Sequence, residues 1–342
     1  MRFGGGSWAR KGEVKSTDAK MSAMKNTSSG FRTTLWIGWM LLSVIGLGYA
    51  RWKGIPNWAA VPSLAAFLIV YPFYLLPAFP RIREQFSGPR LPVVLVACAV
   101  LPYLACCTGA IPFQFTSMAK LAALALALGL WYRVLPIHPL TDAGFLLMFA
   151  AVKLGRYGTG IYPTPYKGVQ ISILTDLTLV ILSILVLMLE RRIRETGYGF
   201  LPTRKDWRIG AKNFLYFLPF GVVLGIVLQA GKLVTPQDPL KLTGYIVGAL
   251  FGTALGEEFL FRGVLQQWLE DWTWSRRTAL VLTSLIFGAA HLWFRQFPNW
   301  KWWIIAGTLG WFCGRARNQA GSIRAAVVTH TLVIASWRAF LL

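Results

Sequence analysis

Three charged side chains stand in a strongly apolar part of the sequence, in the stretch GEEFLFRGVL that begins at residue 256. An ionisable group inside a membrane costs roughly 3 kcal/mol or more, so such groups are rare there unless they are paired or functional. Glu258 and Arg262 are four residues apart and share a helical face, whereas Glu257 points about 100° away. The spacing therefore predicts a Glu258–Arg262 ion pair and leaves the carboxylate of Glu257 free to accept a proton.

Two of the chain's three histidines lie in later apolar segments. His291 follows Phe287 by four residues in IFGAAHL, and His330 lies in VVTHTLV. Histidine within a membrane span usually faces a polar cavity. With a helical rise of about 1.5 Å per residue, Glu257, His291 and His330 lie roughly 18, 21 and 12 Å from the cytoplasmic ends of their segments. The comparable depths predict one intramembrane site built from three helices.

The residue types of this site indicate hydrolysis. A carboxylate in a low-dielectric pocket is suited to accept a proton from water, and histidines can orient that water or stabilise an oxyanion. No serine or cysteine stands in an obvious nucleophile setting, so direct attack by water on an amide is the simplest chemistry. A Glu with two His also matches a catalytic zinc site. Because H-E-x-x-H is absent, we expect neither a metal nor a cofactor, and a zinc-dependent membrane protease is an alternative.

The composition is that of an integral membrane protein. Of the 342 residues, 55% are hydrophobic and 14% are charged, which is too little charge for a soluble surface of this size. The net charge of +22 does not indicate nucleic-acid binding, because most Lys and Arg residues fall between apolar runs, where they orient a protein in the bilayer. The four cysteines have no C-x-x-C spacing, and we interpret them as buried hydrophobic residues. They are Cys98, Cys106, Cys107 and Cys313.

Apolar segments recur along the chain, and the longer ones approach the roughly 20 residues that cross a bilayer as a helix. They predict an all-α fold, a polytopic bundle of about 8–11 transmembrane helices. With a cytoplasmic N-terminus, the cytoplasmic connections carry 22 Lys and Arg residues and the opposite ones carry 7, which fits the positive-inside rule for eleven spans. The segments are 34–50, 58–79, 91–111, 117–132, 140–153, 169–189, 213–231, 244–268, 278–294, 301–314 and 323–341.

Four regions follow from this pattern. Residues 1–33 carry many Lys and Arg residues without apolar periodicity, which predicts a disordered, basic cytoplasmic tail. Residues 34–189 form N-terminal membrane helices to which the sequence assigns no role. Residues 190–212 form a basic cytoplasmic loop, and residues 213–342 form the membrane core that carries the candidate site.

Three motifs in this core resemble a known family when they are taken in order. GEEFLFRG is similar to the E-E-x-x-x-R motif, IFGAAH to the F-x-x-x-H motif, and GSIRAAVVTH to the segment with the third-motif histidine. The family is that of the CAAX protease and bacteriocin-processing (CPBP, or ABI) proteins, glutamic intramembrane endopeptidases, and the resemblance covers about residues 195–342.

The resemblance implies a metal-independent, CAAX-prenyl-protease-like membrane peptidase. Glu257 would activate water, Glu258 and Arg262 would support it, and His291 and His330 would hold the water and the oxyanion. We interpret Phe287 as a wall of the substrate pocket. The substrate would be a membrane-associated or lipidated protein or peptide. Membrane lipids are the other expected partners, nucleic acid is not one, and we expect a bacterial inner membrane.

One position departs from the family pattern. The third motif often continues H-x-x-x-N, and this sequence has Ile334 at the position of the Asn. An expected oxyanion donor is therefore replaced, with Thr329, Thr331 and Ser336 as candidate substitutes. The alternative function is that of a catalytically silent membrane protein with a binding, immunity or transport role.

Overall fold

Helices make up every regular element in the residues that the structure, a computed structural model, describes, namely 8–231 and 239–340. The predicted all-α class is confirmed. Each of the eleven predicted apolar segments overlaps at least one helix. Residues 1–7 of the predicted tail, most of the predicted connection 232–243, and residue 341 of the last predicted segment lie outside the described residues.

Five helical stretches of the described residues are long and apolar enough to cross a membrane. The helix α7 (Ile173–Leu189) is apolar but, with 17 residues, shorter. These stretches agree with the composition, and the chain is an integral membrane protein. The total of about 8–11 spans stays a prediction. The five stretches are Ser29–Trp52, Asn57–Ala78, Gly88–Cys107, Phe115–Val134 and Arg204–Val227.

The chain divides into two compact units, each described by itself. One unit comprises residues Met1–Pro136 and Met148–Arg191, and the other comprises Ile137–Leu147 and Arg192–Leu342. In the first unit, α4 packs against α2, α5 and α7, and its residues Leu95, Cys98 and Tyr103 are fully buried. The longer helices of this unit are α1 (Trp8–Trp52), α2 (Asn57–Leu75), α4 (Leu91–Cys107), α5 (Phe115–Val134) and α7.

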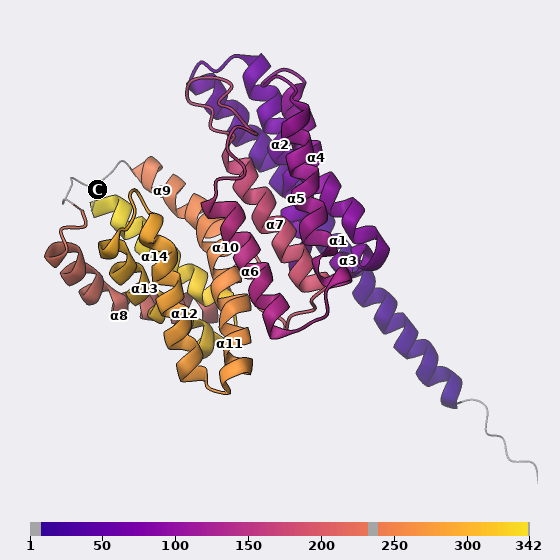
Figure 1. The fold of residues 1–342 in the computed structure, drawn as a ribbon. Helices are drawn as coiled ribbons and strands as arrows, with labels where there is room; N and C mark the ends of the chain where they lie inside the picture. The colour runs from indigo at the N-terminus through magenta and orange to yellow at the C-terminus, as the bar shows by residue number, and fades with distance from the viewer. Residues whose placement is uncertain (1–7, 232–238, 341–342) are drawn as a thin grey trace, which may run out of the picture. The chain divides into compact units, whose positions relative to one another are not determined.

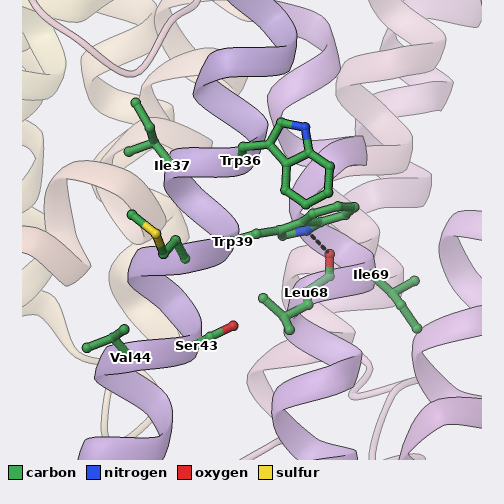
Figure 2. Close-up of a pocket in the computed structure, with 8 residues that line it drawn as sticks. Trp36, Ile37, Trp39, Ser43, Val44, Leu68 and Ile69 are labelled. Carbon is green, nitrogen blue, oxygen red and sulfur yellow. Dashed lines mark hydrogen bonds between the residues drawn. The ribbon is translucent and has the colours of Figure 1, made fainter.

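An apolar groove of about 710 Å³ lies between α1 and α2 of the first unit (Figure 2). The indole Nε1 of Trp39 donates a hydrogen bond of 2.8 Å to the carbonyl oxygen of Leu68, which ties the two helices together beside the groove. The groove is lined by Trp36, Ile37, Trp39, Met40, Ser43, Val44, Leu68 and Ile69. None of the predicted catalytic residues is among them.

The second unit is built around α13, which packs against α8, α12 and α14 (Figure 1). The run from Pro239 to Thr273 combines short α-helices with two π-helical turns, η4 and η5. The elements of the unit are the first part of α6 (Pro139–Leu154), α8 (Arg204–Val227), α9 (Pro239–Gly248), η4 (Ala249–Thr253), α10 (Ala254–Glu258), η5 (Phe259–Leu265), α11 (Gln266–Thr273), α12 (Arg276–Ala290), η6 (His291–Trp293), α13 (Trp300–Ala320) and α14 (Ile323–Phe340).

Two helices begin earlier than the apolar pattern predicts. The helix α8 starts at Arg204, within the predicted loop 190–212, because Thr203 and Asp206 form a capping box: Thr203 Oγ1 accepts from the Asp206 N–H, and the Asp206 carboxylate accepts from the Thr203 N–H. The helix α1 starts at Trp8, within the predicted tail. The first half of α1 is polar and has no apolar face. It contains several Lys, Ala and Met residues, whose high helix propensity favours a helix there.

Candidate active site

The candidate site is carried by the irregular helical run in the middle of the second unit. Glu257 and Glu258 are the last residues of α10, and Arg262 lies in the π-helical turn η5 that follows. Turns of this kind occur frequently at functional sites because they locally rearrange the hydrogen bonds of a helix. The predicted i,i+4 pairing of Glu258 with Arg262 is nevertheless present.

The Glu258–Arg262 pair is fully buried and has contacts on both sides of the guanidinium. Nη1 of Arg262 donates to Oε1 of Glu258 at 3.1 Å, and Nε lies 3.1 Å from Oε2, an ion contact without hydrogen-bond geometry. Nη2 donates to the carbonyl oxygen of Gly310 in α13 at 3.1 Å, and the guanidinium carbon lies 4.2 Å from the ring centroid of Phe287. These contacts offset the desolvation cost of burying the two charged groups.

Glycine at position 310 allows the close approach of α13. A Cβ there would lie 3.3 Å from Nη2 of Arg262, 3.3 Å from the ring of Phe287 and 3.1 Å from the Cα of Ser284. A larger residue would therefore push against both the guanidinium and its aromatic neighbour. The backbone carbonyl of Gly310 can accept from Arg262 because the helices approach so closely.

His330 of α14 joins this pair. Its Nδ1 lies 2.8 Å from Oε1 of Glu258 in a buried contact. Because a Glu carboxylate paired with Arg accepts hydrogen bonds only, this contact favours the tautomer with the proton on Nδ1. Nε2 of the ring is then an acceptor, and it lies 4.0 Å from Oε2 of Glu257.

Glu257 has a different environment from its neighbour. Its side chain is 33% exposed, yet its Oε2 atom is buried and has no hydrogen-bond partner among the described residues. The distance of 4.0 Å to His330 Nε2 is too long for a direct hydrogen bond but allows one water oxygen about 2.8 Å from each atom. Glu258 is thus paired with Arg262, as the spacing predicts, whereas Oε2 of Glu257 has no partner among the described residues.

His291 and Phe287 lie beside this cluster. His291 caps α12, and its Nδ1 lies 2.9 Å from the carbonyl oxygen of Phe287, the one hydrogen-bond partner of the imidazole ring in the described part of the chain. Phe287 is fully buried, and its ring centroid lies 4.8 Å from that of His291 and 5.7 Å from that of His330. The structure therefore connects the two histidines through one aromatic ring, without a polar contact between His291 and Glu257.

Two threonines next to His330 differ in their partners. The Thr329 hydroxyl lies 3.0 Å from the carbonyl oxygens of both Gly210 and Ala325, so its proton is engaged by backbone acceptors. The Thr331 hydroxyl is buried without a hydrogen-bond partner in the described residues. Of these two candidate substitutes for the Asn that Ile334 replaces, only Thr331 retains a free donor.

One group of side chains has the ligand types of a metal site. Glu258, Cys313 and His330 are buried and offer ligand atoms that lie within 4.8 Å of one another. The chemistry of the set fits a metal poorly, because the positively charged Arg262 guanidinium lies 3.1 Å from each oxygen of Glu258 and would repel a cation. The predicted set of one Glu with two His is not among the groups that the described residues form.

A second polar layer begins one helical turn beyond Arg262 and joins α11 to α13. Nε2 of Gln266 donates to Oδ1 of Asn318 at 3.0 Å, and Nη1 of Arg317 donates to Oε1 of Glu270 at 2.6 Å. Arg317 lies beyond the apolar part of α13, and burial lowers its pKa while the charge of Glu270 acts in the opposite direction. These bonds fix the position of α13, and with it the Gly310 carbonyl, relative to Arg262.

Comparison with known proteins is consistent with the three motifs. Residues 239–335 match the family model of the type II CAAX prenyl endopeptidases, described as Rce1-like. The predicted resemblance to the CPBP family is confirmed over this part of the chain, which contains all six predicted site residues. The match supports a membrane endopeptidase-like role and a hydrolase of the CAAX protease type. A search of curated proteins found no match, and neither did a search of solved structures.

Proposed function

We propose that this chain is an intramembrane glutamic endopeptidase that hydrolyses a peptide bond of a membrane-associated or lipidated protein or peptide. The observation that carries the proposal is that Oε2 of Glu257 lies 4.0 Å from Nε2 of His330 and has no hydrogen-bond partner among the described residues. Both residues lie in the region that matches the CAAX prenyl endopeptidase model. The side chain of Glu257 is partly exposed, unlike those of Glu258, Arg262 and His330, and we assign the route of water to this exposed side.

In the proposed reaction, a water molecule between Glu257 and His330 attacks the carbonyl carbon of the scissile bond. The new C–O bond forms as Glu257 takes a proton from the water, and the carbonyl oxygen becomes an oxyanion. When the C–N bond breaks, the amine leaving group takes that proton from Glu257. The products are a carboxylic acid, which ionises, and an amine, so one water molecule is consumed for each bond cleaved.

The remaining residues position these groups. Glu258, held by Arg262, accepts from His330 Nδ1 and keeps Nε2 directed toward the water. Phe287 packs against Arg262 and both histidine rings, so we assign it to the wall behind the site. Because Nδ1 of His291 is engaged by a carbonyl oxygen, we assign its Nε2 side to the oxyanion.

The purified chain tests the proposal and its independence from metal in one experiment. In lipid nanodiscs it should cleave a prenylated peptide with a C-terminal CAAX sequence, or peptides drawn from its host's membrane proteins, at the same rate with and without a chelator. Product is measured by mass spectrometry. A rate abolished by the chelator and restored by zinc would instead assign the activity to a metal at Glu258, Cys313 and His330.

We also infer the orientation from the excess of Lys and Arg, with the N-terminus in the cytoplasm of a bacterial cell and the chain in its inner membrane. Residues 213–342 form the catalytic core in this proposal, and residues 1–33, 34–189 and 190–212 are accessory regions. A reporter that fluoresces only in the cytoplasm, fused to the N-terminus, should be bright. A dark reporter on a folded, membrane-inserted chain would reverse the orientation.

The rival function is that of a silent CPBP-like protein with a binding, immunity or transport role. Ile334, in place of an amide, is the observation that favours it. The match to the CAAX prenyl endopeptidase model over residues 239–335 makes the enzyme the better-supported function. Substitution of Glu257, treated in the Discussion, separates the two functions.

A further inference from the structure

Two basic side chains from different helices meet on one aromatic ring in the second unit. The guanidinium carbon of Arg315 in α13 lies 4.9 Å from the ring centroid of Tyr216 in α8, and Nζ of Lys212 lies 5.7 Å from the same centroid. Both distances are within the range of cation–π contacts. Tyr216 is 40% exposed, so this three-residue group, the Tyr216 cluster, lies on the surface of the unit.

The two cations of the Tyr216 cluster lack an acidic partner. Within the part of the chain that the structure describes, neither Lys212 nor Arg315 has a carboxylate at salt-bridge distance, although two nearby arginines do. Arg317 lies 2.6 Å from Glu270, and Arg324 lies 3.2 Å from Asp206. Because both cations lie close to one ring centroid, an anion in contact with both would be bound favourably.

The cluster lies where the contact between α8 and α13 changes from polar to apolar. The two helices are antiparallel, and their contacts can be followed from the start of α8 inward. Four contacts between α8 and α13 follow one another in this order: Lys205 to the carbonyl of Ala320, Asn213 to Gln319, Tyr216 to Arg315, and Phe220 to Phe312. Lys212 and Arg315 lie just outside the predicted apolar segments 213–231 and 301–314, so we place the cluster at the level where lipid headgroups meet acyl chains.

An exposed stripe continues from the cluster along α8. Its members recur at helical spacing on one face, with cations at the first end and apolar side chains at the other. Phe220, Val223 and Val227 are 56%, 57% and 70% exposed. The stripe consists of Arg208, Lys212, Tyr216, Phe220, Val223 and Val227. Its polarity matches a molecule with an anionic head and a long apolar chain.

We propose that the Tyr216 cluster binds the headgroup phosphate of an anionic phospholipid, with an acyl chain along the stripe below it. The Arg315 guanidinium offers paired donors to phosphate oxygens, and Lys212 adds a point charge. The apolar stripe distinguishes a lipid from free phosphate as the occupant. A bound lipid would join α8 to α13, the helix whose Gly310 carbonyl accepts from Arg262. The site stands independently of the catalytic proposal.

The test measures lipid affinity by native mass spectrometry on the purified full chain. In detergent, phosphatidylglycerol should bind the wild type more tightly than phosphatidylcholine does. The double variant Lys212→Gln/Arg315→Gln should bind phosphatidylglycerol roughly 30-fold more weakly, about fivefold for each lost cation. The matched control, Arg276→Gln/Arg277→Gln, removes the same charge from exposed positions at the start of α12 and should bind as the wild type does.

The exposed single variant Lys212→Gln keeps the test decisive if the double variant fails to fold, with about fivefold weaker binding expected. Unchanged affinity in the Lys212 variant would overturn the proposal. An equal loss in the Arg276/Arg277 control would assign the effect to overall charge and overturn it as well. Displacement of the lipid by inorganic phosphate at equal concentration would show that the anion alone is recognised, contrary to the proposed role of the apolar stripe.

Discussion

Replacing Glu257 with Gln should slow peptide hydrolysis by about a hundredfold to ten-thousandfold, the usual contribution of a general base. Gln keeps the size of the side chain but cannot take a proton from the water beside His330. Oε2 of Glu257 has no hydrogen-bond partner among the described residues, so the substitution breaks no native hydrogen bond there. Initial rates on a peptide substrate, measured with the purified chain, check this expectation.

The matched control for Glu257→Gln is His138→Gln, which changes the third histidine at an exposed position. It should leave the rate unchanged, and Glu257→Gln should unfold at the wild-type temperature. Turnover of Glu257→Gln at the wild-type rate would exclude Glu257 as the base. If the cellular role of the protein also survived this substitution, the silent binding or transport function would be the better one.

Replacing Arg262 with Met should lower the free energy of unfolding by about 3–5 kcal/mol, because it leaves Glu258 as a buried charge without its main partner. The guanidinium is fully buried and also donates to the Gly310 carbonyl, so the packing of η5 against α13 is weakened as well. Denaturant unfolding in detergent micelles measures the change. Activity should fall too, since His330 depends on a fixed Glu258.

Two further variants distinguish the effect of losing the ion pair on stability from the effect of losing side-chain volume. Arg276→Met removes an exposed arginine and should change the free energy of unfolding by less than about 0.5 kcal/mol. The double variant Glu258→Leu/Arg262→Met removes both charges and should be less destabilised than the sum of the two single variants, which gives a coupling between neighbouring residues of about 0.5–3 kcal/mol. A loss below about 1 kcal/mol for Arg262→Met would contradict the described burial.

Much of the fold could be predicted because a membrane limits what a chain can do. Each apolar segment of sufficient length had to become a helix, and the segments overlap the helices of the structure. The Glu258–Arg262 pair followed from spacing alone, because residues four apart meet on a helical face. Such local geometry is encoded over a few residues and needs no knowledge of the tertiary arrangement.

Contacts between helices were beyond reach from the sequence. Nothing in the spacing indicated that His330 lies on Glu258 rather than on Glu257, because the rotation of α14 depends on packing with other helices. Cys313 lies near both Glu258 and His330, yet a lone cysteine in an apolar helix carries no spacing signal. Comparable depth in the membrane likewise could not show that His291 makes no polar contact with Glu257, since depth gives no lateral distance between residues.

The most direct measurement of the central claim is the labelling of new C-termini in membranes of the protein's own host, incubated in H₂¹⁸O with the purified chain. Peptide mass spectrometry would compare the wild type with Glu257→Gln. We predict membrane-protein fragments whose new C-terminal carboxylate carries ¹⁸O with the wild type, and only background labelling with the variant. Equal labelled fragments from both proteins would contradict the assignment of Glu257 as the base that activates water.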